Sequence, residues 1–123
     1  MPPRRPAIDP ASLLPLKADV FHILLTLAEG DAHGYAIIRG SATRPGRRGQ
    51  LQPGAMYRLL KQLLDRGLVV DVEGPASADE RRRYYRITPA GREVARAEAR
   101  RLDELVRASR QAALLEGPGR GRP

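Results

Sequence analysis

Three polar side chains, Arg58, Lys61 and Gln62, follow one another at helical spacing in the segment that begins at Pro53. Arginine can pair bidentately with guanine and glutamine with adenine, and a cationic head can also contact a phosphate. These residues are therefore candidates for contacts with the bases or the backbone of DNA in its major groove. The alternative is an ordinary solvated helix face, and the choice depends on the elements that surround this segment.

Four further residues near helix starts are candidates for phosphate contacts. Gln52 and Gly54 lie where the same helix begins, and the first N–H groups of a helix have no partner within it. Tyr57 lies on the flank of that helix, so its hydroxyl could reach a phosphate or its ring could pack against a neighbouring hairpin. Tyr35 lies at the start of an earlier helix, where we favour a core position whose hydroxyl could still reach a phosphate.

An arginine run, Arg81, Arg82 and Arg83, follows a turn that is rich in small residues. Runs of charge are usually solvated, and Asp79 and Glu80 could pair with these arginines. A run at the tip of a β-hairpin can also reach the DNA backbone. Because the flanking segments predict such a hairpin, we favour the backbone contact.

The composition excludes several kinds of site. The chain has 123 residues and no cysteine, which rules out disulfides, cysteine zinc ligands and a cysteine nucleophile. His22 and His33 are too few for a metal site and have no ligand spacing. No nucleophile elbow, phosphate-binding loop or dinucleotide fingerprint occurs. We therefore expect no catalytic residue, no cofactor and no metal, and a protein that is not an enzyme.

The charge of the chain is strongly positive. Lysine and arginine number 22 against 14 acidic residues, which gives a formal net charge of +8. Lys17 and Lys61 are the only lysines, so arginine supplies nearly all of the excess. An anionic partner such as nucleic acid explains this charge, and an arginine-rich genome would also contribute to it.

Both ends of the chain differ in composition from its middle. Residues 1–15 contain five prolines and predict a flexible arm, and residues 117–123 predict a disordered basic tail. The N-terminus lacks the apolar region of a signal peptide, and no apolar run approaches the roughly 20 residues of a membrane span. We expect a cytoplasmic protein with no membrane partner.

The first half of the chain predicts two short helices. The first covers about 16–28 and is apolar around most of its circumference, which implies contacts on two sides. Gly30 is placed to end it. Asp31 is then placed to cap a second helix over about 32–43, with Tyr35 turned inward.

A third helix is predicted from Pro53 to Gly67. Proline suits the first position of a helix, where its missing N–H costs nothing. Lys61 is expected to pair with Asp65 one turn later. The apolar stripe, which leaves Arg58 on the opposite face, comprises Met56, Leu59, Leu60, Leu63, Leu64 and Leu68.

Two strands are predicted after this helix, over 68–72 and 83–87, with a turn between them. Side chains alternate between the two faces of a strand, so one of Tyr84 and Tyr85 should face the core and the other should not. Together the two strands form a hairpin, the wing that carries the arginine run.

The last predicted element is a long helix. Thr88 is placed as its N-cap and Pro89 as its first residue, and it runs to about 115. The fold class is therefore mostly α with a small β-hairpin. Residues 16–88 predict a winged helix-turn-helix and residues 89–116 a C-terminal dimerisation helix.

Three sequence blocks make the expectation more specific: HGYAII at 33–38, LQPGAMYRLLKQLLDRGLV at 51–69 and RRRYYRITPAGRE at 81–93. Together, and at this spacing, they resemble the PadR family of transcriptional regulators in its short form. The resemblance implies a dimeric winged helix regulator, usually a repressor, that is released from DNA by a small-molecule effector. It also implies that the first and last helices form the dimer.

The last helix carries small and apolar residues at alternating spacings of four and three, as a helix–helix seam does. With the excess apolar surface of the first helix, this pattern agrees with the dimer that the resemblance implies. The expected interface residues are Val20, Phe21, Leu24, Ala95, Ala99, Leu102, Val106 and Ala113. An effector could bind among Phe21, Leu24, Leu102 and Val106.

The combined expectation is a sequence-specific DNA-binding transcriptional regulator. It would bind double-stranded DNA as a homodimer at an inverted repeat and act as a repressor. Two alternatives remain open at this point. One is a winged helix that binds an acidic protein partner, and the other is a non-specific nucleic-acid binder that depends on its arginine-rich ends.

Overall fold

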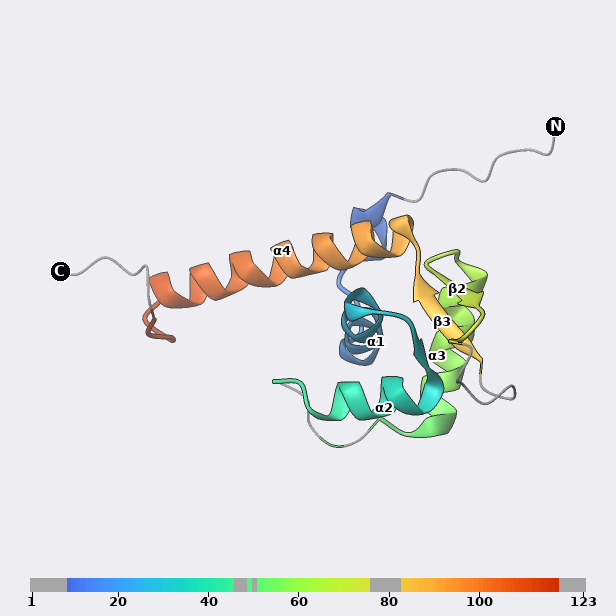
Figure 1. The fold of residues 1–123 in the computed structure, drawn as a ribbon. Helices are drawn as coiled ribbons and strands as arrows, with labels where there is room; N and C mark the ends of the chain where they lie inside the picture. Colours follow the sequence, from blue (N-terminus) through green and yellow to red (C-terminus); the bar gives the residue numbers. More distant parts are fainter. Residues whose placement is uncertain (1–8, 46–48, 50, 76–82, 118–123) are drawn as a thin grey trace.

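The computed structural model describes residues 9–45, 49, 51–75 and 83–117. Figure 1 shows helices and a small sheet packed together, with one long helix that extends away from them. The predicted fold class, mostly α with a small β element, is confirmed. The elements are η1 (Pro10–Leu13), α1 (Ala18–Glu29), β1 (Ala32–His33), α2 (Gly34–Ala42), α3 (Pro53–Asp65), β2 (Val69–Val72), β3 (Tyr84–Ile87) and α4 (Pro89–Gln111).

The sheet has one more strand than the sequence predicted. β2 and β3 form the expected antiparallel hairpin, in which Val69 is opposite Ile87. β1 pairs with the other side of β3, so the strand order is β1-β3-β2. Ala32 lies opposite Tyr85 in this pairing. β1 could not be predicted because two residues are too few to show the alternation of apolar and polar side chains that indicates a strand. Its pairing with β3 defines it.

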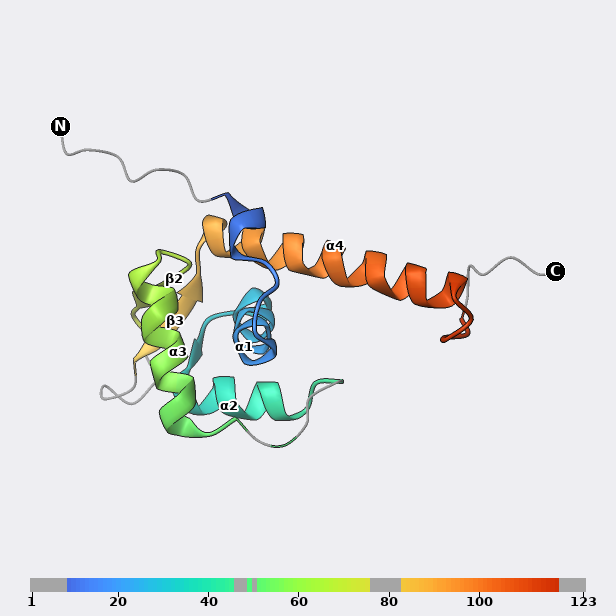
Figure 2. The same cartoon turned by 180° about the vertical axis from the view of Figure 1, so that it is seen from behind.

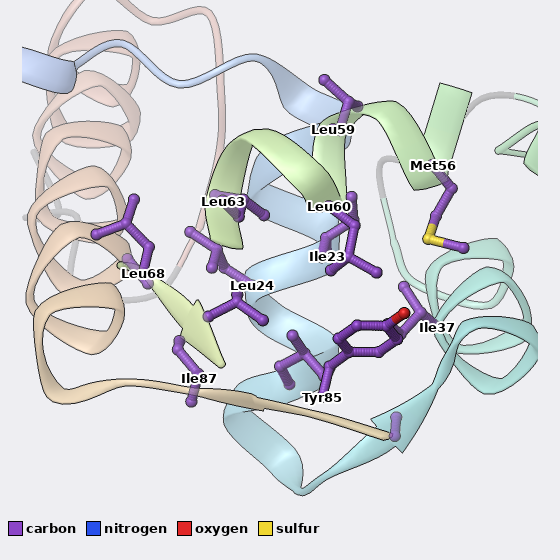
Figure 3. Packing of buried hydrophobic residues seen from close by; sticks show 14 of the residues in the cluster. Ile23, Leu24, Ile37, Met56, Leu59, Leu60, Leu63, Leu68, Tyr85 and Ile87 are labelled. Carbon is purple, nitrogen blue, oxygen red and sulfur yellow. The ribbon is translucent and has the colours of Figure 1, made fainter. Parts of the chain in front are cut away.

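The core is built around α1. Ile23 and Leu24 on this helix are completely buried, because α1 is packed by α2, α3, α4 and β3. Figure 3 shows how side chains of α1 meet Leu60 and Leu63 of α3 and the ring of Tyr85. The apolar stripe of α3 is thus turned inward, as predicted. The buried apolar residues are Ile23, Leu24, Leu27, Ala32, Ile37, Ile38, Leu51, Met56, Leu59, Leu60, Leu63, Leu68, Val69, Tyr85, Ile87, Val94 and Ala95.

The caps of α2 and α4 show how local sequence and long-range pairing compete. Thr88 caps α4 as predicted: its hydroxyl accepts the N–H of Gly91 at 3.0 Å. The prediction for α2 is wrong. His33, not Asp31, caps this helix, because its ring nitrogen accepts the N–H of Ala36 at 3.1 Å. Asp31 instead pairs with Arg86 on β3, at 2.7 Å.

The end of the predicted flexible arm is folded. Within residues 9–15, Asp9 caps the short helix η1 by accepting the N–H of Ala11 at 3.1 Å. η1 packs against α4. The expectation of a flexible arm is therefore wrong for this part. Residues 1–8 and 118–123 lie outside the described residues.

α4 begins in the core and ends outside it. Its buried residues are Gly91, Val94, Ala95 and Glu98, all in its first half. Gly91 lies so close to the backbone that an added Cβ would meet the carbonyl oxygen of Leu68. Figure 2 shows the second half of the helix extending beyond the other elements. In this fold α3 lies at the surface of the compact part, and the second half of α4 extends away from it.

Candidate nucleic-acid interface

The outer face of α3 carries the three polar residues that the sequence singled out. Arg58, Lys61 and Gln62 are all exposed, and the buried leucines occupy the opposite side. The Lys61 ammonium lies 3.4 Å from the Asp65 carboxylate, which confirms the predicted pair. Within the described residues, the Arg58 side chain has no ion pair or hydrogen bond. Its five N–H donors are therefore available to an acceptor on another molecule.

The start of α3 leaves backbone donors open. Gln52 is the N-cap but forms no side-chain cap, and both Gln52 and Gly54 are exposed. Nothing lies within 4 Å of the position where a Cβ on Gly54 would be. Leu51, which is 1% exposed, fixes this end of the helix to the core. The arrangement can accommodate a phosphate at the N-terminus of α3.

Tyr35 lies at the surface rather than in the core, so our core assignment is wrong. Its side chain is 62% exposed. The ring stacks on His33, with the two ring centroids 6.5 Å apart, and the guanidinium of Arg39 lies 5.8 Å from its centroid. The reason is that His33 caps the helix and the buried position falls to the adjacent Gly34. This exposure suits a contact from the Tyr35 hydroxyl to a phosphate.

Arg39 is a candidate that the sequence reasoning missed. It is exposed on α2 and lies over the Tyr35 ring. Its position four residues after Tyr35 was the available signal, since side chains at this spacing share a helix face. Arg39 adds a cation beside the start of α2.

Tyr57 connects the starts of α2 and α3. An added Cβ on Gly34 would meet the phenol end of Tyr57, so the glycine makes room for this ring. The Tyr57 side chain is still 51% exposed. This contact is with Gly34 of α2, and the two roles that we weighed, a phosphate contact and packing against the hairpin, stay predictions.

The described part of the wing carries one of the three predicted arginines. Arg83 is exposed, and its guanidinium lies 3.5 Å from the Asp71 carboxylate on β2. Arg81 and Arg82 lie outside the described residues. Tyr85 is buried while Tyr84 is only half-buried, which confirms the predicted alternation. Tyr84 meets His33 edge to face, with centroids 5.3 Å apart, so the wing is packed against the start of α2.

Other kinds of site find no support in the described residues. No group of three or more histidine, cysteine, aspartate or glutamate side chains among them could hold a metal ion. Burial lowers the pKa of His22, and the nearby positive charge of Arg44 acts in the same direction. In the same part of the chain, no helix combines the length and apolar character that crossing a membrane requires.

The residues expected at a dimer interface fall into two groups. Leu24 is completely buried inside the chain and has no surface for a partner, so its assignment is wrong. The same burial removes Leu24 from the expected effector site. Ala95 is also buried. Val20, Phe21 and Val106 are half-buried, and Ala99, Leu102 and Ala113 are exposed.

One exposed apolar residue on α4 was missed. Leu105 is 52% exposed and lies three residues after Leu102, which is 37% exposed. The (i, i+3) spacing places both leucines on neighbouring positions of one face. The signal was present in the sequence as a second leucine beside the seam.

Comparison with known proteins identifies a family of transcriptional regulators. The model of the Transcriptional regulator PadR-like family matches residues 23–97. The Transcriptional regulator Rv3488 of Mycobacterium tuberculosis is 39% identical over 90 residues, which cover 70% of this chain and 77% of that protein. Proteins of this kind regulate transcription and are not enzymes.

Two solved structures share the fold. A PadR family transcription regulator from Clostridium difficile superposes with a TM-score of 0.67 at 21% identity, and covers 79% of this chain and 99% of that chain. The transcriptional regulator BldR from Sulfolobus solfataricus gives a TM-score of 0.66 at 22% identity, with coverage of 88% and 69% respectively. The match over 23–97 spans more than half of the 123 residues. The chain belongs to the PadR-like family of transcriptional regulators.

Proposed function

We propose that this regulator binds an inverted-repeat DNA sequence as a homodimer and represses transcription by occupying it. The observation that carries the proposal is the open face of α3. Arg58 and Gln62 are exposed on this face, and the N-terminus of the helix has no side-chain cap. In a winged helix, this helix enters the major groove and its side chains contact base edges.

The flanking elements supply the backbone contacts in this proposal. Tyr35 is exposed at the start of α2, Arg39 is exposed in the last turn of that helix with its guanidinium over the Tyr35 ring, and Arg83 lies on the wing. Contacts of this kind position a protein on the duplex without reading its sequence. Base recognition is therefore assigned to α3, and general affinity to α2 and the wing.

The dimer is proposed from α4. This helix has 23 residues and a length of about 35 Å. Past Glu98 it has no buried residue, yet it exposes Leu102 and Leu105. A half-helix of this kind gains little stability alone, because helices in proteins depend on packing of an apolar face. A second copy that packs on α4 and on Val20 and Phe21 of α1 would cover this surface.

Two α3 helices held by such a dimer would enter successive major grooves about 34 Å apart. The DNA site would then be an inverted repeat, since a two-fold protein contacts two equivalent half-sites. Repression follows if the site overlaps a promoter, because the bound dimer blocks access to it.

Light scattering and DNA titration test the dimer. We expect the wild-type mass to be that of two chains. The double variant L102E/L105E should be monomeric and bind DNA about 100-fold more weakly, because it loses the second linked contact. The control D103N changes an exposed neighbour that pairs with Arg107 at 3.6 Å, and should remain dimeric. A wild-type monomer that binds DNA as tightly as expected of the dimer would contradict the proposal.

A further inference from the structure

A cavity of about 240 Å³ lies between the N-terminal segment, α1 and α3. It is not the effector site that the sequence suggested, since neither Phe21 nor Leu102 lines it. Its position matters because α3 carries the proposed DNA-reading face. The lining residues are Leu13, Pro15, Leu16, Lys17, Val20, Leu59, Gln62, Leu63, Arg66 and Leu68.

The cavity wall is aliphatic. Leucine, valine and proline side chains make up most of it, and no aromatic ring lines it. An apolar cavity of about 150 Å³ can hold benzene, which has six carbon atoms. In proportion, this cavity holds a ligand of about ten non-hydrogen atoms. The wall chemistry selects a flexible aliphatic body rather than a flat ring that would stack.

Two cations line the same cavity without partners. Lys17 and Arg66 are exposed. Across the residues that the structure describes, neither side chain forms an ion pair or a hydrogen bond. A carboxylate at the cavity mouth could therefore accept charge-assisted hydrogen bonds from both. The Gln62 amide, which also lines the cavity, supplies a further donor.

We propose that this cavity binds a small aliphatic monocarboxylate, with its chain among the leucines and its carboxylate between Lys17 and Arg66. A second cavity of about 370 Å³ is less suited to such a ligand. There Asp31 and Arg86 already pair with each other, and Arg92 donates to the carbonyl oxygen of Ala28 at 3.3 Å.

The ligand would act on DNA binding through two elements that it touches at once. Leu16 lines the cavity and donates its backbone N–H to Glu98 on α4 at 3.2 Å. Leu59 and Gln62 line it from α3. A ligand that fits better when these elements separate would change the angle between α4 and α3. This consequence rests on the proposed function, because it matters only where α4 sets the distance between two α3 helices.

The test is a titration with sodium octanoate, which has ten non-hydrogen atoms, followed by calorimetry and by backbone amide NMR shifts. We expect saturable binding, with shifts in residues 13–20 and 59–68. K17M and R66M should each weaken binding by about tenfold, since each removes a charge-assisted contact. R96M, which removes an equal charge from the other cavity, should bind octanoate like the wild type. The neutral analogue 1-octanol should bind more weakly than octanoate.

Absence of octanoate binding overturns the proposal, and so does equal binding to R96M, K17M and R66M or a shift map elsewhere in the chain. These outcomes need no DNA and so are independent of the proposed function. On DNA selected by the wild type, saturating octanoate should weaken binding about fivefold or more, and this response should be lost in K17M. Octanoate binding in the cavity with unchanged DNA affinity would overturn the coupling to α3.

Discussion

The Glu98 carboxylate on α4 accepts the backbone N–H of Leu16, 82 residues earlier in the chain, at 3.2 Å. Glu98 is 2% exposed, and Arg101 donates to it at 2.5 and 2.9 Å. The hydrogen bond from Arg101 and its charge hold the pKa of Glu98 below its ordinary value, even though burial acts in the opposite direction. This contact joins the segment just before α1 to the middle of α4, and these are the two helices of the proposed dimer.

Loss of this contact should destabilise the fold. E98A leaves the Leu16 N–H without a partner and the Arg101 guanidinium without its carboxylate, so we expect the free energy of unfolding to fall by about 2 kcal/mol. Urea unfolding measures this. D103N, at an exposed carboxylate on the same helix, should change it by less than about 0.5 kcal/mol. Equal effects of the two variants would show that burial of Glu98 is unimportant.

The same contact predicts a pH dependence. The folded-state pKa of Glu98 lies below its ordinary value of 4.5. Its stabilising contribution is therefore present above pH 4.5 and is lost as the pH falls through the folded-state pKa. E98Q has no such group, so the difference in unfolding free energy between wild type and E98Q should shrink as the pH falls below 4.5. A difference that stays constant with pH would contradict the assignment.

Gly91 should tolerate no side chain. An added Cβ would meet the Leu68 carbonyl oxygen and would lie 2.8 Å from Cγ1 of Ile87. We expect G91A to lower the free energy of unfolding by about 2 kcal/mol, since the backbone at Leu68, just before β2, must move. G54A is the matched control, because nothing lies within 4 Å of its Cβ. Thermal melts in which the two variants behave alike would refute the close approach.

Tyr35 should affect DNA binding without affecting the fold. Because its side chain is 62% exposed, Y35A should change the free energy of unfolding by less than about 0.5 kcal/mol. Its affinity for DNA should fall about tenfold, through loss of one phosphate contact. Y85A removes a tyrosine that is 5% exposed, and should destabilise the chain by about 3 kcal/mol or more. Unfolding and DNA titration of both variants separate the two roles.

Replacement of Arg58 and replacement of Arg83 should change DNA binding in different ways. R58A should lose about 1–3 kcal/mol of discrimination at one base pair, because its guanidinium is assigned to a base edge. R83A should weaken binding to all sequences alike, since a wing contact to the backbone carries no sequence information. Competition titrations with single-base variants of a bound site measure both. If R58A weakens binding to all sequences equally, Arg58 does not contact a base edge.

Local patterns in the sequence predicted much of this molecule. The Thr88 cap, the Lys61–Asp65 pair and the inward stripe of α3 each depend on residues within a few positions of one another. The predictions that failed were those in which a contact between distant segments determines the structure. Asp31 was free to pair with Arg86, 55 residues later, so it does not cap α2.

The candidate site was predicted in part for the same reason. Exposure of Arg58 follows from helix periodicity alone. Burial of Glu98 does not, because a glutamate on a helix is ordinarily solvated, and here it depends on a contact with Leu16, which is 82 residues earlier in the chain. Leu24 was assigned to a dimer interface because α1 is apolar around most of its circumference. The sequence does not show how many elements of the same chain pack around that helix.

Selection of bound sequences from a pool of random DNA duplexes, at near-physiological salt, tests the central claim most directly. The account predicts enrichment of an inverted repeat whose half-sites are centred about one helical turn apart. With R58A, enrichment should be lost at one base pair of each half-site, and with D103N the whole repeat should be enriched as with the wild type. Retention of DNA without enrichment would show a non-specific binder, and no retention would favour a protein partner; either result would contradict sequence-specific recognition by α3.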